Sequence, residues 1–275
     1  FALCIFGGSK QISKITEVLV PFMGIFYLAV ALFVTVTHYT LIPKMFSDIF
    51  SNAFDIRAIF GGFAGSCVMN VIKRGLFSNE AGVGSAPNAA ASAAVSHPVK
   101  QGLVQMLSVF IDTILICSAT ACLLLCSGVA PSEELKGMPW VQAAASESLG
   151  SFGTIFITVA LCLFAFTTLI GNFYYAEMGL KYLCGKTPGK TLLNLFRVIA
   201  ALIVLAGSVM EFGLVWSTAD VLMGFMALIN LPVILLLGGT AIRCMKDYMR
   251  QKKEGRDPVF KAADIGLKEK TDFWD

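Results

Sequence analysis

The sequence predicts an all-α integral membrane protein, a helical bundle in which one helix is broken. The 275 residues are 56% hydrophobic and only 14% charged, whereas ordinary soluble domains are about 25% charged. Several apolar runs approach the ~20 residues that cross a bilayer as a helix. Between two of these runs lies Arg74–Pro87, whose glycines, proline, serines and asparagine disfavour a continuous helix.

The apolar runs give the crossings in chain order. The first is Ile15–Thr37, which Pro21 should kink. Two half-spans, Ile56–Ile72 and Gly84–Ser96, flank the broken segment and together make the second crossing. The alanine-rich run Ala89–Val95 in the second half-span should form a smooth helix surface. The other crossings are Gln101–Cys126, Phe152–Tyr175, Leu192–Trp216 and Ala219–Ile242.

The distribution of charge predicts the orientation. Lysines and arginines gather in alternate loops, and the opposite loops carry mainly acidic residues. By the positive-inside rule this supports six crossings in the plasma membrane, with a cytosolic C-terminus. We therefore expect a membrane domain at 1–242 and a charged cytosolic tail at 243–275. Residues 1–8 resemble the end of a further span, so we expect the chain to be the C-terminal part of a longer protein.

The broken segment is the first candidate site. Lipid cannot hydrogen-bond a bare backbone, so non-helical chain at this depth must line a cavity or be buried in protein. A broken helix leaves free N–H and C=O groups that can hold a carboxylate and a cation. We expect the residues of this segment to line a substrate cavity: Phe77, Ser78, Asn79, Glu80, Gly82, Gly84 and Ser85.

Charged residues at membrane depth form a second group with structural or coupling roles. Lys73 and Arg74 precede the break, and they either pair with Glu80 or Asp112 in a water-filled cavity or snorkel into an aqueous vestibule. Asp112 lies near the centre of its span and should face inward with a partner. It is either a coupling acid or one half of an ion pair that fixes packing.

Two adjacent hydroxyls, Thr167 and Thr168, lie inside the fourth crossing. Sodium is a hard cation that takes several oxygen ligands, so these hydroxyls are candidate sodium ligands. The alternative is that each hydroxyl bonds its own helix or packs between helices.

Other chemistries find little support in the sequence. The basic residues cluster at span ends, which argues against nucleic-acid binding. No ligand cluster accompanies His38 or His97, and the cysteines form no CxxC pair. We predict no enzyme activity and no cofactor, and we interpret Trp140 and Trp216 as interfacial anchors.

The run Arg74–Pro87 resembles the hallmark RGxFSNEAGxGSAP of the sodium:alanine (amino acid carrier) symporter family. The resemblance extends to four further segments: His97–Leu103, Phe110–Thr113, Phe164–Gly171 and Gly224–Pro232. It implies a partial LeuT-type inverted-repeat transporter, with core helices five to ten present here. Core helix six would be the broken one, and core helices one to four would lie upstream.

The resemblance also implies a function. We expect a symporter that imports a small neutral amino acid, alanine or glycine, together with a sodium ion by alternating access. Sodium is then a co-transported ligand, and the partners are the amino acid, sodium and the lipid bilayer. Thr168 would belong to the sodium site or the substrate pocket. Asn172 stands where many relatives have Trp, so substrate preference could differ from theirs.

Three alternatives stay open at this point. An ion channel also uses non-helical backbone in its filter, but it would carry current without saturable amino acid uptake. An intramembrane enzyme would need a catalytic pair at one depth, for which Asp112 and Glu80 are a weak case. An inactive truncated fragment of a transporter is the third.

Overall fold

The computed structural model describes residues 1–6, 9–53, 74–75, 77–80, 82–130, 132, 135, 137–185, 188–267, 271 and 274. Every regular element that these residues form is helical, which confirms the predicted all-α class. The predicted half-span Ile56–Ile72 and Lys73 lie outside the described residues.

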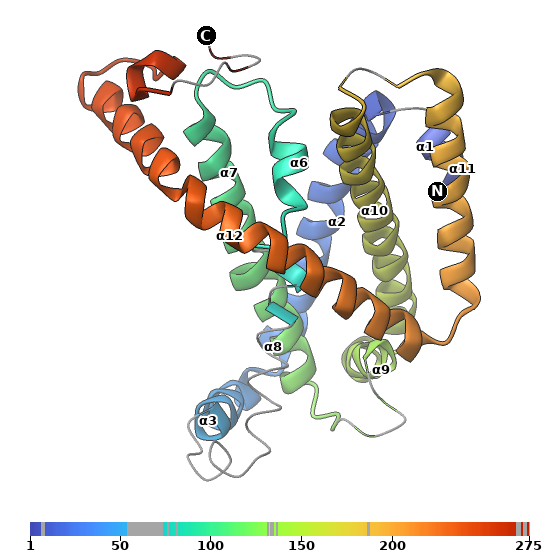
Figure 1. Cartoon of the computed structure of the whole chain (residues 1–275). Helices are drawn as coiled ribbons and strands as arrows, with labels where there is room; N and C mark the ends of the chain where they lie inside the picture. Colours follow the sequence, from blue (N-terminus) through green and yellow to red (C-terminus); the bar gives the residue numbers. More distant parts are fainter. Residues whose placement is uncertain are drawn as a thin grey trace. The chain divides into compact units, whose positions relative to one another are not determined.

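The helices that the described residues form follow one another along the chain. In chain order they are α1 (Ala2–Phe6), α2 (Ser9–Thr37), η1 (Tyr39–Leu41), α3 (Ile42–Ala53), α6 (Ala86–Ala90), α7 (Pro98–Phe110), η2 (Ile111–Cys117), α8 (Ser118–Cys126), α9 (Met138–Leu149), α10 (Ser151–Leu183), α11 (Lys190–Val209), α12 (Phe212–Lys253) and η3 (Ala262–Ile265). Figure 1 labels the α-helices in the same way.

Five stretches of the described chain are long and apolar enough to cross a membrane. They are Glu17–Thr37, Pro98–Cys126, Ser151–Leu183, Lys190–Val209 and Phe212–Lys253. They correspond to the five unbroken crossings expected from the sequence. The large apolar residues along α11 and α12 are mostly exposed, as suits helices that face lipid.

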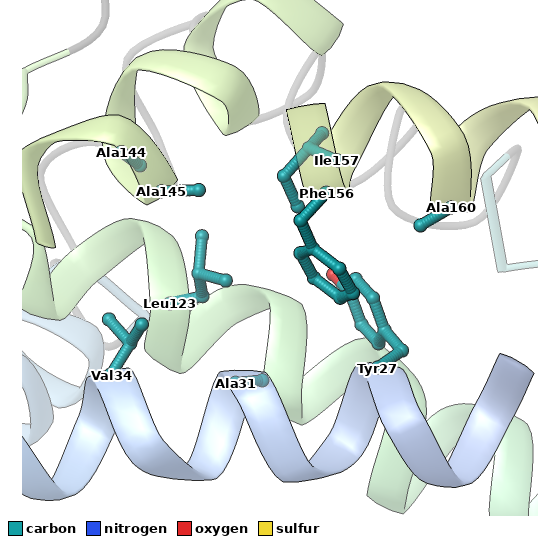
Figure 2. Close-up of a cluster of buried hydrophobic side chains, with 9 residues drawn as sticks. All are labelled: Tyr27, Ala31, Val34, Leu123, Ala144, Ala145, Phe156, Ile157 and Ala160. Carbon is teal, nitrogen blue, oxygen red and sulfur yellow. The ribbon is translucent and has the colours of Figure 1, made fainter. Parts of the chain in front are cut away.

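The chain divides into two compact units. The first holds Phe1–Val71 and Ile111–Ala206, and the second holds Ile72–Phe110 and Gly207–Asp275. In the first unit α2 packs against α8 and α10, and α9 lies against α10. A buried cluster joins these four helices, and Figure 2 shows Tyr27, Phe156 and Leu123 directed into it. The Tyr27 hydroxyl also bonds the Thr120 hydroxyl at 2.8 Å, which satisfies both groups inside the unit.

The second unit contains α6, α7, α12 and η3. Helix α12 contacts both α7 and η3. The chain after α12 returns to the start of α7, where the Phe260 amide donates to the Ser96 carbonyl at 2.9 Å. The Gln251 side chain both donates to the Val259 carbonyl and accepts from the Val259 amide. Residues 257–260 are therefore held against the start of α7 and the end of α12.

Three boundaries differ from the sequence prediction. The half-span Gly84–Ser96 contains only the short helix Ala86–Ala90, and the rest of the alanine run is turn and irregular chain. Small residues alone did not keep this run helical. The last two crossings meet at Met210 and Glu211, so Trp216 belongs to α12. Helix α12 also continues through residue 243 to Lys253, past the predicted end of the last crossing at Ile242.

Candidate functional site

The backbone is irregular where the sequence predicted the break. Phe77, Ser78 and Asn79 are still helical, and the helix ends at Glu80. Glu80 has φ of 50°, and Gly82 and Gly84 have φ of 80° and 98°. Among the described residues Glu80 is the one non-glycine residue with positive φ. Such backbone is costly for a side-chain-bearing residue, and surrounding contacts must hold it.

Two asparagine side chains satisfy carbonyls that the break leaves free. Asn230 from α12 donates through Nδ2 to the Gly82 carbonyl at 3.0 Å. Asn88 from α6 donates through Nδ2 to the Gly84 carbonyl at 3.3 Å. Each carbonyl oxygen has a second lone pair, which can still accept a bond or coordinate a cation.

The approach of α12 to the broken segment leaves room only for glycine at positions 82 and 84. A Cβ on Gly82 would lie 2.8 Å from Leu231 Cδ2, and a Cβ on Gly84 would lie 2.9 Å from Asn230 Cγ. The positive φ values independently disfavour any side chain. The positive φ values and the close approach of α12 together explain why glycine occupies both positions.

Glu80 closes the break through its side chain. The Ser85 hydroxyl donates to Glu80 Oε2 at 2.5 Å, a distance typical of a hydroxyl bonded to a carboxylate. Ser85 and Val83 are buried, and Glu80 is half-buried. The carboxylate thus has one oxygen engaged within the loop, and its other oxygen can still take a ligand.

Arg74 pairs with an acid, and that acid is Asp220 on α12. Nη1 and Nη2 of Arg74 lie 3.2 and 3.4 Å from Oδ1 and Oδ2 of Asp220, which makes the contact bidentate. The guanidinium also lies 4.6 Å from the centre of the Trp216 ring, and Phe77 stacks on that ring at 5.3 Å. Trp216 therefore contacts the start of the broken segment. The interpretation of Trp216 as an interfacial anchor did not include this contact.

The predicted sodium ligands belong to the other unit, on α10. Thr167 is half-buried and donates its hydroxyl to the Phe164 carbonyl at 3.0 Å, while Thr168 is exposed. Asn172 is also exposed, one turn further along the helix from Thr168. The bond of Thr167 uses its hydrogen and leaves its oxygen lone pairs available to a cation.

Asp112 lies in an unexpected local structure. Residues Ile111–Cys117 form a π-helix between α7 and α8, and Asp112 is in its first turn. A π-helical stretch widens the helix and often occurs at functional positions. The sequence prediction of a continuous helix there missed it, because the apolar pattern is the same for both.

The structure thus joins the predicted segment to α12 at Arg74, Phe77, Gly82 and Gly84. Three of the residues that secure it, Asn230, Asp220 and Trp216, were not among the predicted site residues. The sequence did contain a signal for one of them. Asn230 is a polar residue inside a long apolar stretch, two positions before Pro232, and such residues in a membrane helix usually have a specific partner.

Comparisons with known proteins agree with the hallmark run. The model of the sodium:alanine symporter family matches residues 1–262. Amino-acid carrier protein AlsT of Bacillus subtilis is 44% identical over 274 residues, which cover 100% of this chain and 58% of that protein. The probable sodium/glutamine symporter GlnT of the same organism is 42% identical over 94% of this chain and 54% of its own length.

A third relative carries a sodium/alanine name. Sodium/alanine symporter AgcS of Methanococcus maripaludis is 39% identical over 92% of this chain and 55% of its own length. The chain spans little more than half the length of these relatives. The family match covers nearly all of the chain, including the break and α12. This chain belongs to the sodium:alanine symporter family.

Proposed function

We propose that the full-length protein containing this chain is a sodium-coupled symporter that imports a small neutral amino acid across the plasma membrane by alternating access. The observation that supports it most is the broken segment of the hallmark run, tied to α12 through the Gly82 carbonyl and Asn230. Family membership supports the same conclusion. Transport of this kind needs binding groups and a conformational change, without covalent chemistry.

The substrate would bind at the break. Backbone groups of the segment and the polar side chains of Ser78, Asn79 and Glu80 offer donors and acceptors to an amino acid's carboxylate and ammonium groups. Thr168 and Asn172 on α10 would complete the substrate pocket, and Thr167 and Thr168 would supply sodium ligands. Arg74 and Asp112 would act as structural or coupling residues.

Alanine and glycine are the first substrates to test. One relative carries a sodium/glutamine name, so glutamine is a necessary competitor in the same assay. The exposed amide of Asn172 favours including polar substrates.

Uptake of radiolabelled alanine into vesicles containing the full-length protein tests the proposal. We expect saturable uptake when external sodium is present and loss of uptake when choline replaces sodium. Unlabelled glycine, glutamine and D-alanine as competitors would rank the substrates. Uptake that is unchanged in choline would refute sodium coupling, and current without saturable uptake would indicate a channel.

A further inference from the structure

A cavity of about 280 Å³ at the C-terminal end of α12 lies outside the broken segment. Its volume is close to the lower end of ligand pockets, roughly 300 Å³. All of its lining residues belong to the second unit. Four come from α12 and two from η3, which lies beside it (Figure 1): Arg243, Lys246, Asp247, Arg250, Asp264 and Ile265.

Three cationic side chains line this cavity, and two of them are already held in position. Arg243 donates through Nη1 to the Ile265 carbonyl and through Nη2 to the Thr240 hydroxyl, both at 3.2 Å. Arg250 contacts Oδ1 of Asp247 at 2.5 Å. Lys246 lies between the two arginines in sequence and is exposed. Preorganised cations lose less conformational entropy when they bind an anion.

The two carboxylates of the cavity differ in their surroundings. Asp247 is buried, and Arg250, Gln251 and His97 all contact it, at 2.5, 2.8 and 3.4 Å. Its negative charge is therefore largely compensated. Asp264, which lines the cavity from η3, is exposed and can accept a hydrogen bond from a hydroxyl. A phosphate that carries a hydroxyl-bearing group fits this combination better than a bare anion does.

The cavity begins where the apolar part of α12 ends. Residues Val221 to Ile242 include no charged side chain, and Arg243 is the first one after them. From Arg243 to Arg250 the helix rises about 10 Å, comparable with a headgroup layer of roughly 5 to 8 Å. Ile242 and Met249 are 58% and 48% exposed along this part of the helix. They offer an apolar surface to acyl chains beside the charged cavity.

We propose that this cavity binds the headgroup of an anionic, hydroxyl-bearing phospholipid of the phosphatidylglycerol class. Lys246 and the two arginines contact the phosphate, Asp264 accepts from a headgroup hydroxyl, and the acyl chains lie along the exposed apolar face of α12. The site is separate from the proposed transport function and does not depend on it.

Native mass spectrometry of the detergent-solubilised full-length protein, titrated with phosphatidylglycerol, tests this site. We expect Lys246→Gln to weaken binding of the lipid about fivefold, since a direct ion pair between exposed partners contributes up to about 1 kcal/mol. Lys252→Gln is the matched control. It also removes one exposed positive charge from the end of α12 but lies outside the cavity, so it loses no direct contact with the phosphate, and we expect a change of less than about twofold.

Each other result contradicts part of the proposal. Equal weakening in both variants would show diffuse attraction to a basic surface and overturn the site. Displacement of the lipid by inorganic phosphate at a similar concentration would show a soluble-anion site and overturn the lipid assignment. Equal binding of phosphatidylcholine would overturn the requirement for negative charge. Circular dichroism of both variants confirms that any difference arises in folded protein.

Discussion

At the scale of single residues, the two glycines of the break are constrained both by positive φ and by side chains of α12. Gly82 combines positive φ with a Leu231 side chain that would lie only 2.8 Å from a Cβ added there, and Gly75 has no such neighbour within 4 Å. We expect Gly82→Leu to abolish uptake and still insert into the membrane, because the new side chain occupies space that α12 already fills. Gly75→Ala, the matched control, should retain most uptake. Wild-type kinetics in Gly82→Leu would contradict this account.

A second prediction at the residue scale concerns the side chain of Asn230. Its Nδ2 donates to the Gly82 carbonyl, so its side chain positions the loop. Asn230→Asp keeps the shape but places an acceptor against another acceptor, whereas Asn230→Ala only removes the bond. A neutral hydrogen bond contributes roughly 0.5–1.5 kcal/mol, and an unsatisfied or repelled group costs more. We therefore expect uptake at neutral pH to fall further in the aspartate variant.

The KM and kcat for alanine in both Asn230 variants check this order. A positioning role predicts that KM rises in both, since the backbone that binds substrate loses its support. Equal activity of the two variants would show that the Asn230 amide acts only through its volume.

The charged and polar partners show where sequence reasoning succeeded and where it stopped. The run of helix breakers located the irregular backbone at Glu80 and residues 82–85, because glycine and proline act through the local chain, but Phe77–Asn79 stay helical. The partner of Arg74 was not Glu80 or Asp112 but Asp220, which lies 146 residues away in sequence. Such a pairing depends on how α12 packs against the segment, and no periodicity in either segment contains that information.

At the scale of elements, helix lengths were predicted less well than helix positions. Apolar composition places a span in the bilayer but does not end it there. Helix α12 therefore continues past Ile242, and α10 continues past Tyr175, into polar turns that hydropathy assigned to loops. The π-helix at Ile111–Cys117 was equally invisible, since a shifted hydrogen-bond pattern leaves composition unchanged.

The prediction about sodium concerns Thr167 and Thr168 on helix α10. Thr167→Val and Thr168→Val keep side-chain shape and remove one oxygen each. If these hydroxyls bind sodium, its half-saturation concentration should rise roughly 10- to 100-fold, by analogy with the 1.5–3 kcal/mol of a charge-assisted bond. The measurement is uptake against sodium concentration at fixed alanine.

The two threonine variants also separate the roles of the hydroxyls. Thr167 bonds the Phe164 carbonyl, so its variant alone should lose a helix contact. Shifts below about twofold in both variants would mean that the hydroxyls only pack helices. A change confined to the half-saturation for alanine would instead assign Thr168 to the substrate pocket.

The stability of the contacts between the segment after α12 and the start of α7 should depend on pH. His97 is fully buried, its Nδ1 accepts from the Val99 amide at 3.2 Å, and its Nε2 faces Asp247. Burial lowers the pKa of His97 below 6.5, against the opposing effect of Asp247. Between the lowered pKa and 6.5 the unfolded imidazole binds a proton and the folded one does not, so stability falls as pH drops through this interval.

Hydrogen exchange at the Val259 and Phe260 amides can measure that loss. These amides bond Gln251 and Ser96 next to His97, so their protection should decrease as pH falls below 6.5. Because intrinsic exchange also depends on pH, protection factors must be compared rather than rates. His97→Asn removes the titrating group and should flatten the dependence. An unchanged dependence in that variant would assign it to a group other than His97 and contradict this account.

At the scale of the whole molecule, α12 connects the two regions that carry the proposals. Its first half holds the broken segment through Asp220 and Asn230, and its C-terminal end forms the cationic cavity. A helix of 42 residues is about 63 Å long, well beyond the ~30 Å of a hydrocarbon core. A shift of α12 during transport would therefore move both regions together.

Coupling itself is the property that only the full-length protein can show. A symporter requires that sodium raise the affinity for alanine, and linkage then requires that alanine raise the affinity for sodium by the same factor. We expect this factor to be about 5 to 150, the usual range for a coupling free energy of 1–3 kcal/mol. Equilibrium binding of each ligand to the purified protein, with and without the other, measures both factors. Gly82→Leu should lower alanine binding in both conditions, and a wild-type protein whose two factors both equal one would show that sodium and substrate bind independently.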